Sequence, residues 1–288
     1  MSQRSIYRKT KQTMQPYIDP QSIQYFAFNI WNIESAKAIL DAASKVQQAV
    51  ILQTSMKAFQ QIDKEELRVF INDYQKKKNI RAYLHLDHCR EIASIETAIA
   101  CGWDSVMLDA SSQSLEENIR LTNRVSAIAR KQGVLVEAEI GQIKGVEDNI
   151  KVTEAGIANL SDIQKFIANT EIDMLAAAIG TSHGLYQGAP KIHYDLIEEI
   201  SDFTEIPLVI HGGTGLSKET FQKLLSYKNI KKINISTEVK LAYREGIDKS
   251  IQKGYLEKDS FDPLKMVSQI HDSIEEMAID KMKLLKKE

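Results

Sequence analysis

Residues 81–89 read RAYLHLDHC, a short apolar stretch that ends in two chemically active side chains, Asp87 and His88. The alternation of side chains along a strand puts His85 and Asp87 on one face, with leucines on the other. The same design, an apolar run followed by a polar or glycine-containing turn, recurs along the chain and predicts strands. The eight predicted strands are 25–30, 49–55, 81–87, 105–110, 135–140, 174–180, 208–213 and 232–237.

Amphipathic helical patterns lie between most of these strands. Ala36, Ile39, Leu40 and Ala43, for example, share one face of a helix. Strand and helix alternating eight times predict an α/β fold, a closed (β/α)8 or TIM barrel, built as a single domain over residues 1–288. An open, doubly wound sheet is the alternative.

Three further segments carry predictions about the barrel ends. We expect residues 1–20 to form a short helix beneath the barrel. Residues 141–160 and 181–191 are longer than the usual connection after a strand. Long connections at the functional face are candidate lids, so we expect both to be mobile active-site loops.

Composition excludes several classes of function. The 288 residues carry a net charge of -2 and are 43% hydrophobic, enough for one large core. The weak charge does not favour nucleic-acid or membrane binding, and no apolar run approaches the roughly 18 residues of a spanning helix. Cys89 and Cys101 are the two cysteines and form no metal motif. We therefore expect a reduced, cytoplasmic protein.

Three histidines follow predicted strands: His88, His183 and His211. The carboxyl ends of the strands in a (β/α)8 barrel meet at one face, where active sites lie. Neutral imidazole is a good zinc ligand, and three protein ligands leave one coordination position for substrate. The sequence therefore predicts a catalytic zinc site.

Two turns at the last strands suit a phosphate. HGGTG at 211–215 follows the seventh strand and NIST at 234–237 ends the eighth. Loops at these positions of a barrel often cradle phosphate with backbone N–H groups and hydroxyls, and glycine lets the backbone approach closely.

Acidic residues fall into two groups. Asp109, Glu137 and Glu139 end the fourth and fifth strands, where they could orient metal ligands or form an alternative metal position. Glu147 lies in the long connection after the fifth strand. A carboxylate on a closing loop suits a general base.

These motifs resemble the class II, zinc-dependent ketose-bisphosphate aldolases, which include fructose- and tagatose-bisphosphate aldolases. The resemblance spans nearly the whole chain. The motifs that carry it are HLDHC at 85–89, VEAEIGQIKGVED at 136–148, AAAIGTSHGLY at 176–186, HGGTG at 211–215 and NIST at 234–237.

The resemblance implies a role for individual residues. Zn2+ would bind His88, His183 and His211, with Asp109 and Glu139 as a possible second metal site. Asp87 would exchange a proton with the aldehyde oxygen, Glu147 would take the proton from dihydroxyacetone phosphate, and Asn234 would bind the enediolate. The substrate and its phosphate would be held by Asn29, Ser55, Gly184, Gly212, Gly213, Thr214, Asn234, Ser236 and Thr237. A monovalent cation, Na+ or K+, and a homodimer or higher homo-oligomer are further implications.

The implied reaction is an aldehyde-lyase reaction through a zinc-stabilised enediolate. A phosphorylated ketose, fructose 1,6-bisphosphate first, would be cleaved into dihydroxyacetone phosphate and an aldehyde such as glyceraldehyde 3-phosphate. Tagatose 1,6-bisphosphate, or a ketose 1-phosphate without a second phosphate, is the alternative. A non-catalytic sugar-phosphate-binding homologue and a zinc hydrolase are weaker alternatives, because Asp87, Glu147 and Asn234 are all present. The sequence leaves a glycolytic and a peripheral pathway both open.

One position departs from the family pattern. Members that act on bisphosphates usually have Asp-Pro-Arg before the last helix, and this arginine holds the second phosphate, usually across a subunit interface. Here Asp262-Pro263 is followed by Leu264 and Lys265. Leucine cannot bind a phosphate, and lysine lacks the bidentate fork of arginine. The sequence therefore does not establish which chemical group the substrate carries at its distal end.

Overall fold

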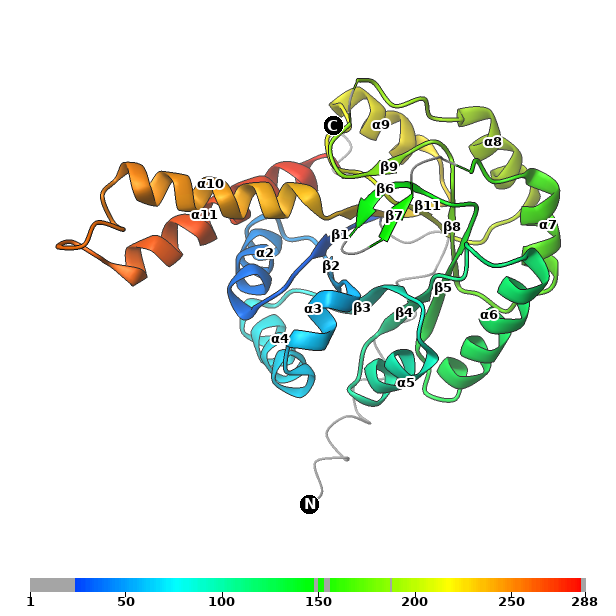
Figure 1. Cartoon of the computed structure of the whole chain (residues 1–288), viewed down its shortest axis with the longest axis horizontal. Helices are drawn as coiled ribbons and strands as arrows, with labels where there is room; N and C mark the ends of the chain where they lie inside the picture. The colour runs from blue at the N-terminus through cyan, green and yellow to red at the C-terminus, as the bar shows by residue number, and fades with distance from the viewer. Residues whose placement is uncertain (1–23, 148–149, 153–155, 187, 286–288) are drawn as a thin grey trace, which may run out of the picture.

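The computed structural model describes residues 24–147, 150–152, 156–186 and 188–285. Eight parallel strands close into a barrel in the order β1-β11-β10-β8-β5-β4-β3-β2, which confirms the predicted TIM barrel (Figure 1). The barrel strands are β1 (Tyr25–Asn29), β2 (Val50–Thr54), β3 (Ala82–Cys89), β4 (Ser105–Leu108), β5 (Leu135–Ile140), β8 (Met174–Ala177), β10 (Leu208–Ile210) and β11 (Ile230–Ile235). The helix predicted within residues 1–20 lies outside the described residues.

Helices surround the barrel and cover its outer face (Figure 1). Most begin at a polar residue whose side chain accepts a hydrogen bond from the first turn. Asn32 and Ser35, for example, form a reciprocal capping box at the start of α2. The helices are α2 (Ile33–Val46), α3 (Met56–Gln61), α4 (Lys64–Lys78), α5 (Ile92–Ala100), α6 (Leu115–Arg130), α7 (Leu160–Ala168), α8 (Tyr194–Phe203), α9 (Lys218–Ser226), α10 (Thr237–Gln252) and α11 (Pro263–Lys283).

The barrel interior changes character along the strands. At the amino ends, buried apolar side chains form a small core of their own, separate from the main core between barrel and helices. Two residues further along β1 and β2, Asn29 and Gln53 follow Ala27 and Ile51 on the same face. In β3, His85 and Asp87 follow Tyr83 in the same way. The carboxyl half of the barrel therefore holds buried polar groups above an apolar floor.

The two long connections contain strands that the sequence did not predict. β6 (Lys144–Glu147), β7 (Ile150–Val152) and β9 (Ser182–His183) form a separate three-stranded sheet in the order β7-β6-β9. Gly145 permits this pairing, because a Cβ there would lie 2.3 Å from the His183 carbonyl oxygen. Residues 141–160 and 181–191 are thus joined to each other by strand pairing, and their mobility stays a prediction.

Helices α10 and α11 pack on each other and project from the barrel as a hairpin (Figure 1). This hairpin carries many of the exposed large apolar side chains found in the described residues. They are Leu241, Ile251, Leu256, Phe261, Leu264 and Val267. None of the helices in the described part of the chain combines the length and apolar character needed to cross a membrane.

Candidate active site

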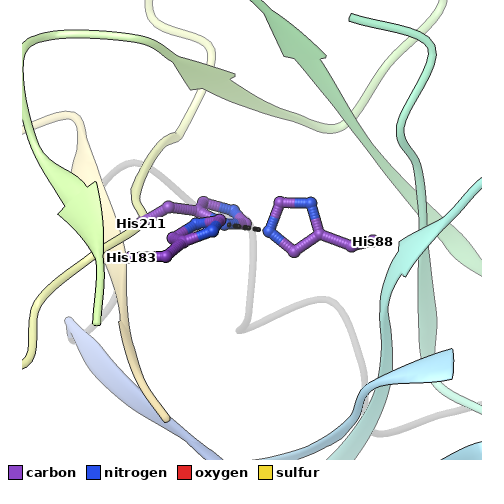
Figure 2. Close-up of side chains that lie close together, drawn as sticks. All are labelled: His88, His183 and His211. Atoms are coloured by element: carbon purple, nitrogen blue, oxygen red, sulfur yellow. Dashed lines mark hydrogen bonds between the residues drawn. The ribbon is translucent and has the colours of Figure 1, made fainter. Parts of the chain in front are cut away.

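The three predicted histidines lie together at the carboxyl end of the barrel. His88 lies next to the last residue of β3, His183 lies on β9, and His211 follows β10. Their ring centroids are 4.6 to 5.8 Å apart, and each offers a ring nitrogen within 4.8 Å of the others. Figure 2 shows the rings converging, with His88 facing the other two. Nε2 of His88 lies 2.9 Å from Nδ1 of His211.

An irregularity in β3 brings His88 into this cluster. Regular alternation would turn His88 to the face opposite Asp87. The register of β3 against β4 shifts between Leu86 and Cys89, and His88 has a φ of +46°. Left-handed backbone is uncommon for a residue with a side chain and often occurs at functional sites. The left-handed backbone at His88 allows the side chains of two consecutive residues, Asp87 and His88, to lie at the same site.

A buried chain of charges orients His211. Nε2 of His211 lies 2.8 Å from Oε1 of Glu137, and Lys232 donates to Oε2 of Glu137 at 2.8 Å. Burial alone would raise the pKa of Glu137, but the Lys232 ammonium and the His211 hydrogen bond together hold that pKa below its usual value. Burial lowers the pKa of His211 to about 4, against the opposing effect of Glu137. A neutral His211 therefore donates through Nε2 and presents the lone pair of Nδ1 to the cluster.

His88 has acidic neighbours on its other side. Its Nδ1 lies 3.7 Å from Oδ2 of Asp109 and 3.6 Å from Oε2 of Glu139. Burial, reinforced by the charge of Asp109, raises the pKa of Glu139 to about 8 despite His88. Arg90 forms an ion pair with Asp109. One ring nitrogen of His88 thus faces two carboxyl groups, and the other ring nitrogen faces His211.

Asp87 is held beside the histidines by amide side chains. It is 1% exposed, and its Oδ2 accepts a hydrogen bond of 3.0 Å from Gln53. The same Gln53 amide donates to Asn29 Oδ1 at 2.6 Å. Asn234 Nδ2 lies 3.4 Å from Asp87 Oδ1 and 3.3 Å from His211 Nδ1. Asn29, Gln53, Asp87 and Asn234 therefore form one buried network that reaches the histidine cluster.

The glycine turns form a small pocket next to the histidines. Gly212 has a φ of +72°, and a Cβ there would lie 2.3 Å from the Ser182 carbonyl oxygen, so glycine is required. Tyr186 donates to the Gly212 carbonyl at 2.6 Å and fixes this turn. The pocket is lined by His183, Gly184, His211, Gly212, Thr214, Asn234, Ser236, Thr237 and Lys240. Gly213, also predicted here, packs against Ile233 and Asn234 in the same turn.

A larger cavity of about 280 Å³ adjoins this network on the side of β1 and β2. Its lining includes Asn29 and Ser55, two predicted substrate-binding residues. Lys57 and Lys240 add positive charge to its walls, and Lys240 also lines the glycine pocket. The two spaces therefore share Lys240 as a lining residue.

Two further positions from the sequence analysis, Glu147 and Leu264, are not among the contacts described above. Glu147 is the last residue of β6, the strand that pairs with His183 at Gly145. Leu264 is the second residue of the projecting α11 and is 81% exposed.

The donor set fits a zinc ion. Three imidazole nitrogens converge, and the outward nitrogens of two rings face buried carboxylates. Carboxylate partners of this kind fix the tautomer and orientation of metal-binding histidines. Three ligands from separate strands leave one side open to substrate, as in catalytic zinc sites.

Sequence reasoning missed several residues of this site. Gln53 and Lys232 are polar residues within buried strands, and this is the signal that could have identified them. Arg90, next to the HLDHC motif, and Tyr186, next to the His183 loop, gave no comparable signal.

Comparison with known proteins agrees with this geometry. The family profile described as Fructose-bisphosphate aldolase class-II matches residues 9–288. The sulfofructosephosphate aldolase of Alkalicoccus urumqiensis is 37% identical over 228 residues, 78% of this chain and 79% of that protein. The fructose-bisphosphate aldolase of Geobacillus stearothermophilus is 36% identical over 259 residues, 89% of each chain.

Solved structures share the fold. The crystal structure of the YdjI aldolase from Escherichia coli K12 has a TM-score of 0.78 at 27% identity and covers 91% of both chains. The fructose-bisphosphate aldolase of Campylobacter jejuni has a TM-score of 0.77 at 21% identity, covering 98% of this chain and 93% of that chain.

Proposed function

This chain belongs to the class II fructose-bisphosphate aldolase family, and we propose that it is a zinc-dependent aldolase that cleaves a ketose 1-phosphate into dihydroxyacetone phosphate and an aldehyde. The observation that carries the proposal is the buried network that joins Asp87 and Asn234 to the converging histidines. A bound Zn2+ supplies a Lewis acid that polarises the ketose carbonyl. A zinc hydrolase would not need Asn234 at this position.

The residues of the chain take distinct roles. Asp87 exchanges the proton of the hydroxyl that becomes the aldehyde oxygen, and Gln53 keeps its carboxylate in place. Asn234 Oδ1 is buried and makes no hydrogen bond within the described structure, which suits an acceptor for a substrate hydroxyl. Glu147 is proposed as the base that moves the proton of dihydroxyacetone phosphate.

The glycine pocket is proposed to bind the 1-phosphate. Gly184 and Gly212 line this pocket with backbone, the Cβ position of Gly184 is open, and α10 begins at Thr237 beside them. Ser236 precedes that helix without a side-chain cap hydrogen bond. The first N–H groups of a helix and free hydroxyls together suit an anion.

Fructose 1,6-bisphosphate is the first candidate substrate, with Lys57 and Lys240 in the adjoining cavity facing the distal phosphate. A second candidate is a sulfonated ketose 1-phosphate, as the name of one relative suggests. Leu264 favours it, because a sulfonate carries one negative charge where a phosphate carries about 1.5 to 2. Less positive charge is then needed than the bidentate arginine of bisphosphate enzymes supplies.

A coupled assay of dihydroxyacetone phosphate release tests the proposal. The substrates are fructose 1,6-bisphosphate, tagatose 1,6-bisphosphate, fructose 1-phosphate and sulfofructose 1-phosphate, each with and without EDTA. We expect chelator-sensitive cleavage, lost in His183→Ala and kept in His271→Ala, a histidine on α11. Cleavage at the same rate with and without EDTA, or no dihydroxyacetone phosphate release from any of these substrates, would contradict the proposed function. Strong cleavage of fructose 1,6-bisphosphate with little gain from Leu264→Arg would exclude the sulfonate candidate.

We also propose a homo-oligomer, with a homodimer as the smallest form. The exposed apolar side chains that gather on the α10–α11 hairpin support it, because exposed apolar surface that forms a patch marks an interaction site. The monovalent cation, the cytoplasmic location and a glycolytic role stay predictions from the sequence.

A further inference from the structure

We propose that Arg90 prevents a metal ion from binding to the acidic pair Asp109 and Glu139. The chain then binds one ion at this end of the barrel, at the three histidines. The acidic pair then serves only to orient His88, whose Nδ1 it faces at 3.6 to 3.7 Å. This inference rests on the metal site of the proposed function. It concerns the group of His88 with Asp109 and Glu139, which shares His88 with the histidine cluster; the other candidate group in the described residues, His271, Asp272 and Glu275, lies apart on α11.

Every oxygen lone pair of Asp109 has a donor. Oδ2 accepts from Arg90 Nε at 2.9 Å and from Arg90 Nη2 at 2.7 Å. Oδ1 accepts from the backbone N–H of Ser111 at 3.2 Å and from its hydroxyl at 2.7 Å. A carboxylate offers about four acceptor positions, and these four donors fill them. Asp109 can bind a metal only if Arg90 leaves.

His88 is shared between the two places. Its Nε2 faces His211 at 2.9 Å, while its Nδ1 faces Asp109 and Glu139 at 3.7 and 3.6 Å. A neutral imidazole has one lone pair and one N–H. If Nε2 binds an ion among the histidines, Nδ1 carries the proton and points it at the carboxylates. A second ion would have to bind the same ring through its protonated nitrogen.

The positive charge of Arg90 also disfavours a metal ion between Asp109 and Glu139. A guanidinium stays protonated, so Arg90 places a permanent positive charge against Asp109. A divalent ion between Asp109 and Glu139 would lie beside that charge in a site where both carboxylates are only 3% exposed, and low dielectric strengthens the repulsion. Arg90 itself lies in the turn between β3 and α5 with 41% of its side chain exposed. It can therefore be replaced without opening the barrel core.

One oxygen stays available when Arg90 is removed. Oε2 of Glu139 is buried and makes no hydrogen bond within the described structure. In Arg90→Ala, Oδ2 of Asp109 and Oε2 of Glu139 could hold an ion together with water. We therefore expect the variant to gain a weaker second site, while Arg90→Lys, which keeps the charge, does not.

Equilibrium dialysis against Zn2+ followed by elemental analysis tests this on the full chain. We expect one zinc per chain in the wild type, in Arg90→Lys and in the control Arg120→Ala, which removes an exposed ion pair with Glu117 on α6. Arg90→Ala should bind a second zinc at least about tenfold more weakly. That second ion should disappear in Arg90→Ala/Glu139→Gln. Thermal melts confirm that each variant is folded.

Other stoichiometries would overturn the inference. Two ions in the wild type, with one lost in Asp109→Asn, would show a working second site despite Arg90. One ion in a folded Arg90→Ala would show that Arg90 does not keep the second ion out. No zinc in the wild type would instead contradict the proposed metal site, and it is distinguishable because it does not depend on Arg90.

Discussion

The buried ion pair between Lys232 and Glu137 yields a quantitative prediction for Lys232→Met. Both side chains are fully buried, and Lys232 Nζ lies 2.8 Å from Glu137 Oε2. Removal of one partner leaves an uncompensated buried charge, which typically costs about 3–5 kcal/mol. In a chain of this size, that loss corresponds to a fall in Tm of roughly 10 °C.

The pH dependence of this loss has a definite sign. In the wild type the pKa of Glu137 is held below its unfolded value of about 4.3, so its contribution to stability is lost as pH falls toward and below that range. In Lys232→Met, burial instead raises the pKa of Glu137, so the variant loses stability as pH rises. The difference in unfolding free energy between the two proteins should therefore be largest near pH 8 and shrink toward pH 5.

Urea unfolding of the metal-free proteins at pH 5 to 8 measures the effect. Lys165→Met is the matched control, because Lys165 and Glu116 form an exposed pair whose loss should cost at most about 1 kcal/mol. The double variant Lys232→Met/Glu137→Gln should recover part of the loss by removing the charge. If Lys232→Met lowers the free energy of unfolding no more than Lys165→Met at pH 8, the buried ion pair does not stabilise the fold as proposed.

Four other changes have expected outcomes. Asp87→Asn should lower kcat by about 10²- to 10⁴-fold with unchanged zinc content, because it removes the proposed acid–base group, and steady-state assays with metal analysis check this. Gln53→Leu should lower kcat by up to about 100-fold through displacement of Asp87, and an effect confined to KM would contradict its positioning role. Gly212→Ala should destabilise the fold and raise KM, since the added Cβ meets a carbonyl oxygen at 2.3 Å; an unchanged melt and KM would argue against the turn as described. Phe261→Asp, at a side chain 59% exposed on the hairpin, should shift the protein toward monomer in analytical ultracentrifugation, and an unchanged mass would move the interface elsewhere.

The barrel could be predicted from the sequence because its signal is repeated and local. Each strand is a short apolar run that ends at a polar turn, and the observed strands overlap all eight predicted ranges. The three histidines could be brought together by the same reasoning, since the carboxyl ends of the strands in a barrel meet at one face.

The rest of the site depends on contacts between distant residues. Lys232 meets Glu137 across 95 positions in sequence, so neither strand alone indicates the pair. The left-handed backbone of His88 arises from a shift in register that period-two alternation does not contain. The sheet of β6, β7 and β9 requires Gly145 to approach His183, which no local pattern encodes. Local patterns thus placed the residues, while long-range packing set their orientation.

The central claim is that a metal held by His88, His183 and His211 makes this chain an aldolase. Its most direct test is to strip the protein with a chelator, add Zn2+ in small steps and follow dihydroxyacetone phosphate release from the best substrate. We expect no release from metal-free protein, then a linear rise with added zinc to a plateau at one zinc per chain, and no release at any zinc level from His183→Ala. Release from metal-free protein, or an unchanged titration in His183→Ala, would contradict it.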